Sequence, residues 1–373
     1  MKITRIEPWV FRAPVVEPVA NAFGSMSNRP SLFVRMTAGD GAWGWGEVFC
    51  NFPQVGAEHR ARLLTSVFKP LIEGRQFLDA SVFRANLEAG TRRMAIQCGE
   101  PGSFAQVTGG LEQAFWDMTA RRANKPLWRL LDERETSSPR VRVYASGIGP
   151  SNVAGVVRSC RAAGHRAFKL KVGFDPALDR ANLVAMREIA GADAAVMIDA
   201  NQAWSPLDAA RRIAELADLK PHWVEEPLAA DEDAAEWRSL ARDAGVPLAA
   251  GENLRGEVAF RDAIGAGYLR FVQPDVGKWG GIGGCRAVAL LAARREITFC
   301  PHWLGGGVGL AASLHLRAGV GEGGMVEVDA NPNPLREEVC TWRVVDGHVE
   351  IPEKPGIGVE PDLARLARYA VKL

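Results

Sequence analysis

Several features that define other protein classes are missing from this sequence of 373 residues. Its six cysteines are scattered and form no Cys-x-x-Cys pair. This argues against a disulfide framework or a zinc site and is typical of reduced thiols in a cytosol. The first residues contain no apolar core of a signal peptide, and no apolar run approaches membrane-spanning length. We therefore expect a soluble, cytoplasmic protein without a membrane partner.

An excess of charge of either sign is also absent. The chain has 45 Lys and Arg residues against 44 Asp and Glu residues, which gives a formal net charge of +1. No basic face for nucleic acid is implied, so we expect no nucleic-acid partner. The apolar and charged fractions are those of an ordinary soluble globular enzyme.

Residues 1–130 are predicted to form an α+β domain, because strand patterns come first and helical patterns follow. Strands are expected at residues 3–11, 32–37 and 42–49. The stretch 14–30 is rich in Pro, Gly, Ser and Asn, and we expect it to be a long loop. A helical stripe, which indicates the buried side of a helix, consists of Leu111, Ala114, Phe115 and Met118.

From about residue 141 onward, short apolar strand patterns alternate with helical patterns at a period near 26 residues. Such alternation predicts right-handed βαβ units and a parallel sheet, and eight strands favour a closed (β/α) barrel. No glycine-rich nucleotide fingerprint follows the first strand, which argues against a Rossmann domain. The expected strands are 141–147, 167–173, 194–201, 222–227, 247–253, 271–276, 297–302 and 325–329.

The segment Phe168-Lys169-Leu170-Lys171-Val172 alternates apolar and charged residues. On a strand, both lysines therefore lie on one face. Two ammonium groups on one face of a buried strand cost free energy unless anionic groups lie opposite them. The segment therefore predicts an anionic partner inside the barrel.

Ionisable residues recur at the carboxyl ends of the predicted strands. From Lys171 onward, successive steps of 28, 26, 27, 23, 27 and 25 residues each span one strand–helix unit. In a barrel this register brings all of them to one mouth, where the catalytic residues of this architecture lie. The seven residues are Lys171, Asp199, Glu225, Glu252, Asp275, His302 and Glu327.

Each of these residues also has a purely structural interpretation. Asp199 could cap a loop, and Glu225 could be a solvated strand end. Asp275 could cap a helix, and a single strand-end histidine such as His302 can be no more than a satisfied hydrogen-bonding partner. These interpretations do not explain why seven ionisable residues recur at one position of a repeat. We therefore favour a functional role for the set.

Three of the acids, Asp199, Glu225 and Glu252, come from consecutive strands. Carboxylates that converge repel each other unless a cation joins them. An all-oxygen, carboxylate-rich site suits a hard divalent ion, and we expect Mg²⁺. Asp275 would orient His302 and raise its basicity. Crowded cations can depress the pKa of Lys171, so that it can act as a base.

A metal with a base on each face suits removal of a proton from the carbon next to a carboxylate, with the metal stabilising the enediolate. This constellation resembles the enolase superfamily and, within it, the mandelate racemase-like subgroup of the mandelate racemase/muconate lactonizing enzyme family. That superfamily serves as a standard example of a Lys or His base working with Mg²⁺. The matching motifs are Lys169-x-Lys171, Asp199-x-Asn201, Glu225-Glu226-Pro227, Gly251-Glu252-Asn253, Pro274-Asp275 with Lys278, and Pro301-His302.

The resemblance implies a role for each matched residue. Asp199, Glu225 and Glu252 would bind Mg²⁺. Lys171 would be the base on one face, and Lys169 would stabilise the substrate carboxylate. His302, paired with Asp275, would be the acid or base on the other face. Further contacts to the substrate are implied for Glu327, Asn201 and Ser146.

The resemblance also implies the fold: an N-terminal α+β capping domain over a (β/α)₇β TIM-like barrel. The barrel would span residues 131–330, and residues 331–373 would return to the capping domain. The segments 14–30 and 49–51 would then close over the barrel mouth and set specificity. Relatives in this family are commonly symmetric homo-oligomers, and the substrate is expected to be a small carboxylate.

The residues fit two reactions. A dehydratase of an acid sugar or small hydroxy acid would use His302 to protonate the departing β-hydroxyl, which we favour. A racemase or epimerase of a 2-hydroxy acid or amino-acid derivative would use Lys171 and His302 on opposite faces. Muconate-type lactonisation fits less well, because that group carries a lysine where Asp275 lies. A catalytically silent, metal-dependent binding protein is the alternative of another class, against which the retention of both bases argues.

Overall fold

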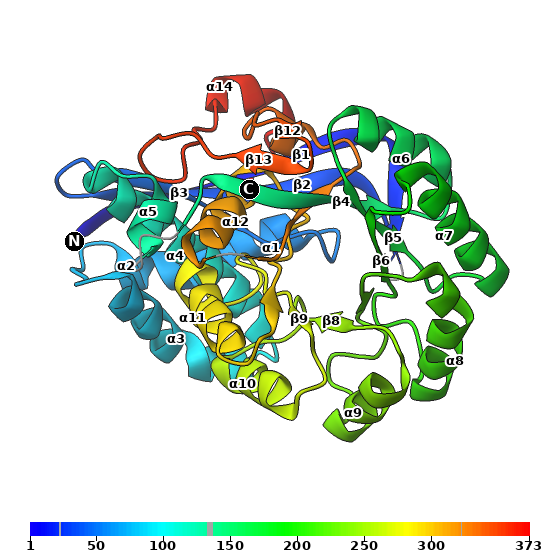
Figure 1. Cartoon of the computed structure of the whole chain (residues 1–373). Coiled ribbons are helices and arrows are strands. Elements are labelled where there is room, and N and C mark those ends of the chain that lie inside the picture. The colour runs from blue at the N-terminus through cyan, green and yellow to red at the C-terminus, as the bar shows by residue number, and fades with distance from the viewer. Residues whose placement is uncertain (22–23, 133–136, 322) are drawn as a thin grey trace.

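The computed structural model describes residues 1–21, 24–132, 137–321 and 323–373, and it consists of a capping domain packed on a barrel (Figure 1). The capping domain begins with an antiparallel three-stranded sheet in the order β1-β2-β3. These strands are β1 (Ile3–Asn21), β2 (Gly24–Ala38) and β3 (Trp43–Val48). The three predicted strands of this domain are therefore present.

The expected loop at residues 14–30 is wrong, because the described part of this stretch forms paired strands. β1 and β2 continue their ladder with Pro14 opposite Asn28 and Val19 opposite Met26. The register shifts between Pro14 and Val19, where Pro18 lies, so the missing proline N–H breaks the ladder only locally. Proline and glycine content therefore misled the prediction.

Helices cover one face of this sheet and enclose its apolar core. The predicted stripe of Leu111, Ala114, Phe115 and Met118 is fully buried on the longest helix, α4, and this prediction is confirmed. A short π-helical turn, η1, interrupts the first helices. The helical elements are α1 (Gly56–Leu63), η1 (Leu64–Phe68), α2 (Lys69–Ile72), α3 (Ala80–Gln97), α4 (Pro101–Arg122) and α5 (Leu127–Leu131).

All eight predicted barrel strands are present, in most cases shorter than predicted. Seven of them pair in sequence order, and the eighth, β11, pairs in parallel with the first, β4. Within the described residues, backbone pairing does not continue between β10 and β11, where the Met325 N–H donates to Cys300 Sγ at 3.4 Å. The strands are β4 (Arg140–Ile148), β5 (Ala167–Lys171), β6 (Ala195–Asp199), β7 (Val224–Glu225), β8 (Leu248–Ala250), β9 (Phe271–Val272), β10 (Thr298–Phe299) and β11 (Val326–Asp329).

The helices between these strands form the outer layer of the barrel (Figure 1). No helix in the described part of the chain is both long and apolar enough to cross a membrane. The outer elements are α6 (Val153–Ala162), α7 (Pro176–Ala190), α8 (Pro206–Leu216), η2 (Ala217–Leu219), α9 (Ala234–Asp243), α10 (Glu257–Ala266), α11 (Gly281–Ala293) and α12 (Gly307–Gly319).

The last residues run back from the barrel to the capping domain. A short hairpin extends the sheet beside β4, and near the end of the chain the Val371 N–H donates to the Val10 carbonyl at 2.9 Å. The elements of this part are α13 (Pro334–Glu337), β12 (Val344–Val345), β13 (His348–Glu350), α14 (Leu363–Leu366) and η3 (Ala367–Tyr369).

Buried carboxylates of the capping domain bind backbone N–H groups of the barrel, and we call this set of contacts the seam. Glu47 on β3 accepts from the N–H groups of Gly306 (2.6 Å) and Gly309 (2.9 Å) at the start of α12. Glu112 on α4 accepts from Ile282 (2.7 Å) and Gly283 (2.9 Å) at the start of α11. Helix N-termini favour negative charge, so both helices are capped by side chains of the other domain.

Two further buried groups join neighbouring parts of the chain in the same way, and we include their contacts in the seam. Asp117 on α4 accepts from the N–H groups of Trp45 and Ile357, both at 2.7 Å. His315 on α12 accepts through Nδ1 from the Trp128 N–H at 3.1 Å. These contacts hold β3, α4, α5 and the C-terminal segment in fixed positions over the carboxyl ends of the barrel strands.

Candidate active site

The strand β5 places two lysines inside the barrel. All five of its residues are buried, and side chains two apart in a strand point the same way. The inward row is Ala167, Lys169 and Lys171. Ala167 belongs to an apolar layer with Met197 and Trp223, and the lysines lie one and two layers above it. The prediction that both lysines share one buried face is confirmed.

The two lysines differ in how many anions they contact. Lys169 is fully buried, and its ammonium contacts three carboxylates: Glu225 at 2.5 Å, Glu327 at 2.9 Å and Asp199 at 3.4 Å. The ammonium of Lys171 forms an ion pair at 2.6 Å with Asp199. Lys169 is thus neutralised by several carboxylates of the protein, whereas Lys171 has one such partner.

The three predicted metal ligands end or follow consecutive strands. Asp199 is the last residue of β6, Glu225 the last of β7, and Glu252 follows β8. All three are buried, and each is turned toward a basic group. Glu252 contacts His302 Nε2 and Lys278 Nζ, the latter at 3.2 Å. In this arrangement no group of acidic, histidine or cysteine side chains within the described ranges converges as a ready-made metal cage.

The charge balance of the mouth nevertheless fits a divalent cation. Six buried carboxylates, those of Asp199, Glu225, Glu226, Glu252, Asp275 and Glu327, lie here with three ammonium groups and one imidazole. Even with the imidazole protonated, two negative charges remain in excess. This count takes all six carboxylates as ionised; without a further cation, burial raises the pKa of Glu225 to about 7 and also raises that of Glu226. An oxygen-rich donor set with this surplus suits Mg²⁺.

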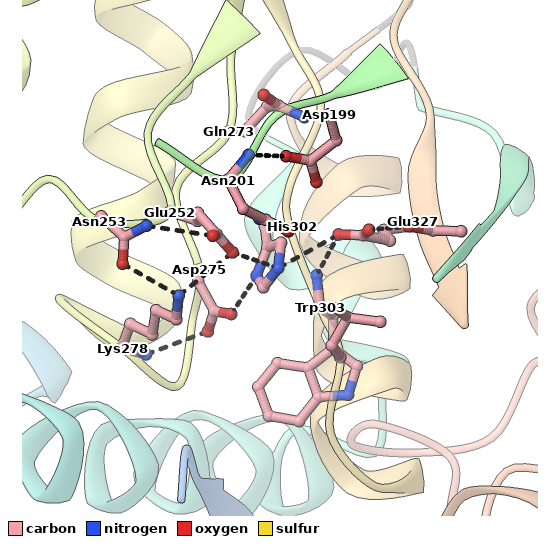
Figure 2. Close-up of polar contacts among 12 residues, drawn as sticks. Asp199, Asn201, Glu252, Asn253, Gln273, Asp275, Lys278, His302, Trp303 and Glu327 are labelled. Carbon is pink, nitrogen blue, oxygen red and sulfur yellow. Dashed lines mark hydrogen bonds and ion pairs between the residues drawn. The ribbon is translucent and has the colours of Figure 1, made fainter. Parts of the chain in front are cut away.

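His302 and Asp275 form the predicted pair. They lie on adjacent strand ends joined by a β-bridge, and His302 Nδ1 lies 2.6 Å from Asp275 Oδ2. Asp275 is fixed in turn by the N–H groups of Gly277 (2.7 Å) and Lys278 (3.0 Å). The other ring nitrogen, Nε2, faces Glu252 and Glu327 (Figure 2). Burial lowers the pKa of His302, but Glu252 and Glu327 outweigh it and raise the pKa to about 10.

Glu327 lies between the lysine side and the histidine side of the site. Its Oε1 contacts Lys169, and its Oε2 lies 3.4 Å from His302 Nε2 (Figure 2). The Trp303 N–H donates to Oε2 at 3.3 Å, and Ser146 Oγ donates to Oε1. Ser146 therefore positions Glu327 in this structure. Its predicted contact with substrate, like that of Glu327, remains a prediction.

Asn201, the last predicted contact residue, is buried two residues beyond Asp199. Its backbone N–H donates to Asp199 Oδ1 at 2.9 Å, and its φ angle is 45°. Left-handed backbone is uncommon outside glycine but is tolerated by asparagine. The turn therefore fixes the orientation of the Asp199 carboxylate.

Sequence reasoning gave no role to three polar residues that the structure brings into the site. Glu226 is buried, with a φ angle of 38°, and accepts from Asn253 Nδ2 through both oxygens. Asn253 also donates to Glu252 at 3.1 Å and accepts from Lys278 Nζ at 3.3 Å. Glu226 and Asn253 had appeared only within the motifs of the metal ligands, and Lys278 only with Asp275. Their polarity directly after buried strands was the available signal.

Two residues below the mouth orient Glu225. Gln273 Nε2 donates to Glu225 Oε2 at 2.6 Å, and Trp223 Nε1 donates to the same oxygen at 3.1 Å. Both lie on the inner face of the barrel. Because the period of two in a strand places Trp223 and Glu225 on one face, their contact was implied by the sequence, although it was not predicted.

The expected depression of the Lys171 pKa is not present in this arrangement. Burial is the largest influence and lowers the pKa of Lys171, as Lys169 does, but Asp199, Glu252 and Glu327 together outweigh them, and the net shift is upward. Lys171 is paired with one of the predicted metal ligands. Its pKa therefore depends on whether Asp199 is shared with another cation.

Both parts of the chain match family models. Residues 5–132 match the mandelate racemase/muconate lactonizing enzyme N-terminal domain, and residues 152–365 match the enolase C-terminal domain-like family. A 3,6-anhydro-α-L-galactonate cycloisomerase from Streptomyces coelicolor is 30% identical over 99% of both chains. A D-galactarolactone cycloisomerase from Agrobacterium fabrum is 28% identical, also over 99% of both.

Solved structures extend the comparison over the whole chain. A mandelate racemase/muconate lactonizing enzyme from Bordetella bronchiseptica is 46% identical over 99% of both chains, with a TM-score of 0.93. A racemase from Streptomyces coelicolor with bound magnesium is 29% identical over 99% of this chain and all of the other, with a TM-score of 0.87. An enolase-type protein from Bradyrhizobium with magnesium and mandelic acid is 29% identical over 100% and 99%, with a TM-score of 0.84.

These matches confirm the predicted capping domain and TIM-like barrel. The predicted magnesium cofactor agrees with the ions that two of the related structures contain. The predicted enzyme class, a lyase or isomerase, is confirmed by relatives named as cycloisomerases and racemases. The chain belongs to the mandelate racemase/muconate lactonizing enzyme family of the enolase superfamily.

Proposed function

We propose that this protein catalyses a β-elimination on a small hydroxy acid, most simply dehydration of an acid sugar to a 2-keto acid. A proton leaves the carbon next to the carboxylate, and an oxygen substituent leaves the adjacent carbon. The observation that supports this best is the His302–Asp275 pair, which directs a proton-bearing nitrogen into a mouth that also contains Lys171. Two proton-transfer groups then serve one substrate.

The proposed ligands of Mg²⁺ are Asp199, Glu225 and Glu252. Their all-oxygen character and the two surplus negative charges of the mouth support this choice. The ion would supply Lewis-acid stabilisation of the negative charge that develops on the substrate carboxylate as the proton leaves. Gln273 and Trp223 hold one oxygen of Glu225, so that carboxylate keeps its orientation.

Lys171 is proposed as the base that takes the α-proton. Its ammonium keeps donor capacity beyond Asp199, whereas that of Lys169 contacts three carboxylates. When Asp199 neutralises another cation, the influence that raises the pKa of Lys171 weakens. Burial and the neighbouring Lys169, which lower the pKa, are then opposed less strongly. Lys169 is proposed to hold the neighbouring carboxylates in position and to stabilise the bound substrate carboxylate.

His302 is proposed as the acid. Asp275, bonded to Nδ1 at 2.6 Å, and Glu327, 3.4 Å from Nε2, both favour the protonated imidazolium. The bond from the α-carbon to hydrogen breaks, and Lys171 takes the proton. The bond from the β-carbon to oxygen then breaks, and the proton of His302 Nε2 goes to that oxygen. The enol that remains tautomerises to a 2-keto acid.

A ring oxygen as the leaving group is the second candidate, and the names of two relatives favour it. Both are cycloisomerases that match over the whole chain. If the departing oxygen belongs to a ring, the same elimination opens the ring and releases no water, so the overall reaction is an isomerisation. Dehydration and cycloisomerisation thus need the same residues and differ only in the substrate.

Incubation in D₂O with Mg²⁺ tests the proposal. Libraries of open-chain and cyclic sugar acids are followed by mass spectrometry for solvent deuterium and for 2-keto product. A keto product from open-chain acids supports dehydration. A keto product from cyclic acids that has lost no water, apart from solvent deuterium, supports cycloisomerisation. Deuterium exchange with inversion and no keto product identifies a racemase or epimerase. Absence of exchange and product throughout leaves the non-catalytic binding protein and contradicts the proposal.

A further inference from the structure

A cavity of about 400 Å³ adjoins the carboxylate cluster on the side of Glu252. Figure 2 shows Asn253 and Lys278 beside Glu252, on the side away from Glu327. The wall combines the segment after β3, one residue of α4, and the loops after β8 and β9. The lining residues are Phe49, Phe52, Pro53, Gln106, Glu252, Asn253, Arg255 and Lys278.

Hydrogen-bond donors dominate the polar part of this wall. Lys278 and Arg255 carry positive charge. The side-chain oxygen of Gln106 accepts from Arg60 Nε at 2.9 Å, so the NH₂ group of Gln106 is the part of this amide that remains to donate. Among the lining residues, the one carboxylate is Glu252, and it is already bonded to His302 and Lys278. The cavity therefore offers donors and few free acceptors.

Arg255 is the least compensated charge in this wall. It is exposed, and within the described residues its guanidinium has no hydrogen bond or ion pair. It lies against the first turn of α4, where a side-chain carbon added at Gly102 would be 3.2 Å from Nη1. The positive end of a helix dipole beside a cation favours an anion between or near them. Glu100, at the start of this helix, is paired with His59 at 3.0 Å.

We propose that the cavity binds a second carboxylate at the far end of the substrate, so that the preferred substrates are dicarboxylic sugar acids or similar diacids. The inference rests on the proposed function, which places the first carboxylate at the metal ligands. Arg255 would bind the distal carboxylate, with Gln106 beside it. A neutral hydroxyl end can accept from these donors but leaves the charge of Arg255 uncompensated, and an aromatic end offers the donors no acceptor. Phe49 and Phe52 contact the carbon chain between the two ends.

Matched pairs of six-carbon sugar acids test this proposal. Each pair, such as galactarate and galactonate or glucarate and gluconate, differs only in a carboxylate or a hydroxymethyl group at the distal carbon. We expect the Mg²⁺-loaded enzyme to favour the diacid in kcat/KM for α-proton exchange or keto product. Arg255→Gln should lower kcat/KM for the diacid roughly 10- to 100-fold, mainly through KM, and leave the monoacid unchanged. Arg255→Lys should recover part of the loss.

Arg261→Gln is the matched control, since Arg261 is an exposed arginine on the next helix, outside this cavity. It should leave both members of each pair unaffected. Equal losses for diacid and monoacid in Arg255→Gln would overturn the inference, and so would a wild-type preference for the monoacid or for an aryl hydroxy acid such as mandelate. Exchange with monoacids alone defeats only this inference. Absence of exchange with every acid defeats the proposed function as well.

Discussion

Two regions of this molecule each bury several carboxylates, and the hydrogen-bonding partners of these carboxylates differ between the two regions. In the barrel mouth the partners are cations: Lys169, Lys171, Lys278 and His302. In the seam, Glu47 and Glu112 are bonded chiefly to uncharged backbone N–H groups at helix starts. Burial raises the pKa of Glu47 and Glu112 to about 7. Glu47 and Glu112 are thus held by backbone dipoles, whereas the carboxylates of the mouth are bonded to cations that they outnumber.

The two fully buried histidines show the same difference. His302 in the mouth has a pKa raised to about 10, because Glu252 and Glu327 outweigh the effect of burial. Burial lowers the pKa of His315 in the seam to about 3, since it has no carboxylate beside it. One imidazole is thus kept charged and the other neutral. In our proposal the surplus negative charge of the barrel mouth serves to bind a ligand. The neutral hydrogen-bonding partners in the seam hold the two domains together.

The largest expected effect tests the mouth. Glu225→Gln removes a charge and one of the three proposed oxygen ligands, so Mg²⁺ binding measured by titration calorimetry should be lost. Turnover should fall by at least about 10³-fold, the scale for losing a principal electrostatic group. Glu236→Gln, on an exposed face of α9, is the control and should bind Mg²⁺ normally. Retained metal binding in Glu225→Gln would refute the proposed ligand set.

The second prediction distinguishes the proposed acid, His302, from the proposed base, Lys171. His302→Asn removes the proposed acid and leaves Lys171 in place. Product formation should fall by roughly 10²- to 10⁴-fold, as for loss of a general acid. Exchange of the α-proton with D₂O, followed by NMR, should continue. If exchange stops together with elimination, His302 rather than Lys171 is the base.

The third prediction concerns the seam. Glu112→Gln retains one acceptor oxygen but places an NH₂ group against backbone N–H donors, and it should lower the free energy of unfolding by about 1–3 kcal/mol. Activity per folded molecule should remain within roughly twofold, because the residue lies outside the mouth. Chemical denaturation and steady-state assays measure the two effects. Glu88→Gln on exposed α3 is the control and should change stability by less than about 0.5 kcal/mol.

The pH dependence of Glu112→Gln gives a sharper test. The pKa of Glu112 is raised in the folded state, to about 7 from an ordinary 4.5, so the folded protein binds this proton more tightly than the unfolded chain. Wild-type stability from this group therefore falls as pH rises from 4.5 to 7, by up to about 1.4 kcal/mol per pH unit. The difference between wild type and Glu112→Gln should shrink across that window. A constant difference would show that Glu112 is ionised throughout.

The smallest effect is expected at His315. Its folded pKa lies below the ordinary 6.5, so the unfolded chain takes up the proton first and stability is lost as pH falls from 6.5 toward 3. His315→Asn keeps an acceptor for the Trp128 N–H and cannot be protonated. At pH 7 it should cost about 1–2 kcal/mol for the lost volume. Its denaturation midpoint should vary less than that of wild type between pH 6.5 and 4.5. Parallel curves would contradict a neutral, buried imidazole.

The strand-end residues could be predicted from sequence because a barrel repeats one geometric rule. Lys169 and Lys171 alternate with apolar neighbours, and each later acid follows its strand at nearly the same interval, so register alone brought them together. No such rule governs the loops. Lys278 and Arg255 reach the cavity through local turns, and their sequence neighbourhood did not predict their direction. The loop prediction for residues 14–30 failed for another reason. Pro14 and Pro30 are paired with Asn28 and Arg12 in the ladder, and only Pro18 falls at the register shift, so the prolines of this hairpin did not exclude strands.

Glu47 and Glu112, the two carboxylates that cap barrel helices, also have a consequence for the entry of substrate. Glu47 and Glu112 attach the capping domain to the first turns of two neighbouring barrel helices. Swinging the whole domain away as a hinged lid would break these buried bonds at a cost of about 1–3 kcal/mol for each stranded group. The segment after β3 is held to the barrel by fewer contacts, such as Asn51 Nδ2 to the Leu304 carbonyl at 2.7 Å. We therefore expect substrate entry to depend on this short segment rather than on movement of the whole capping domain.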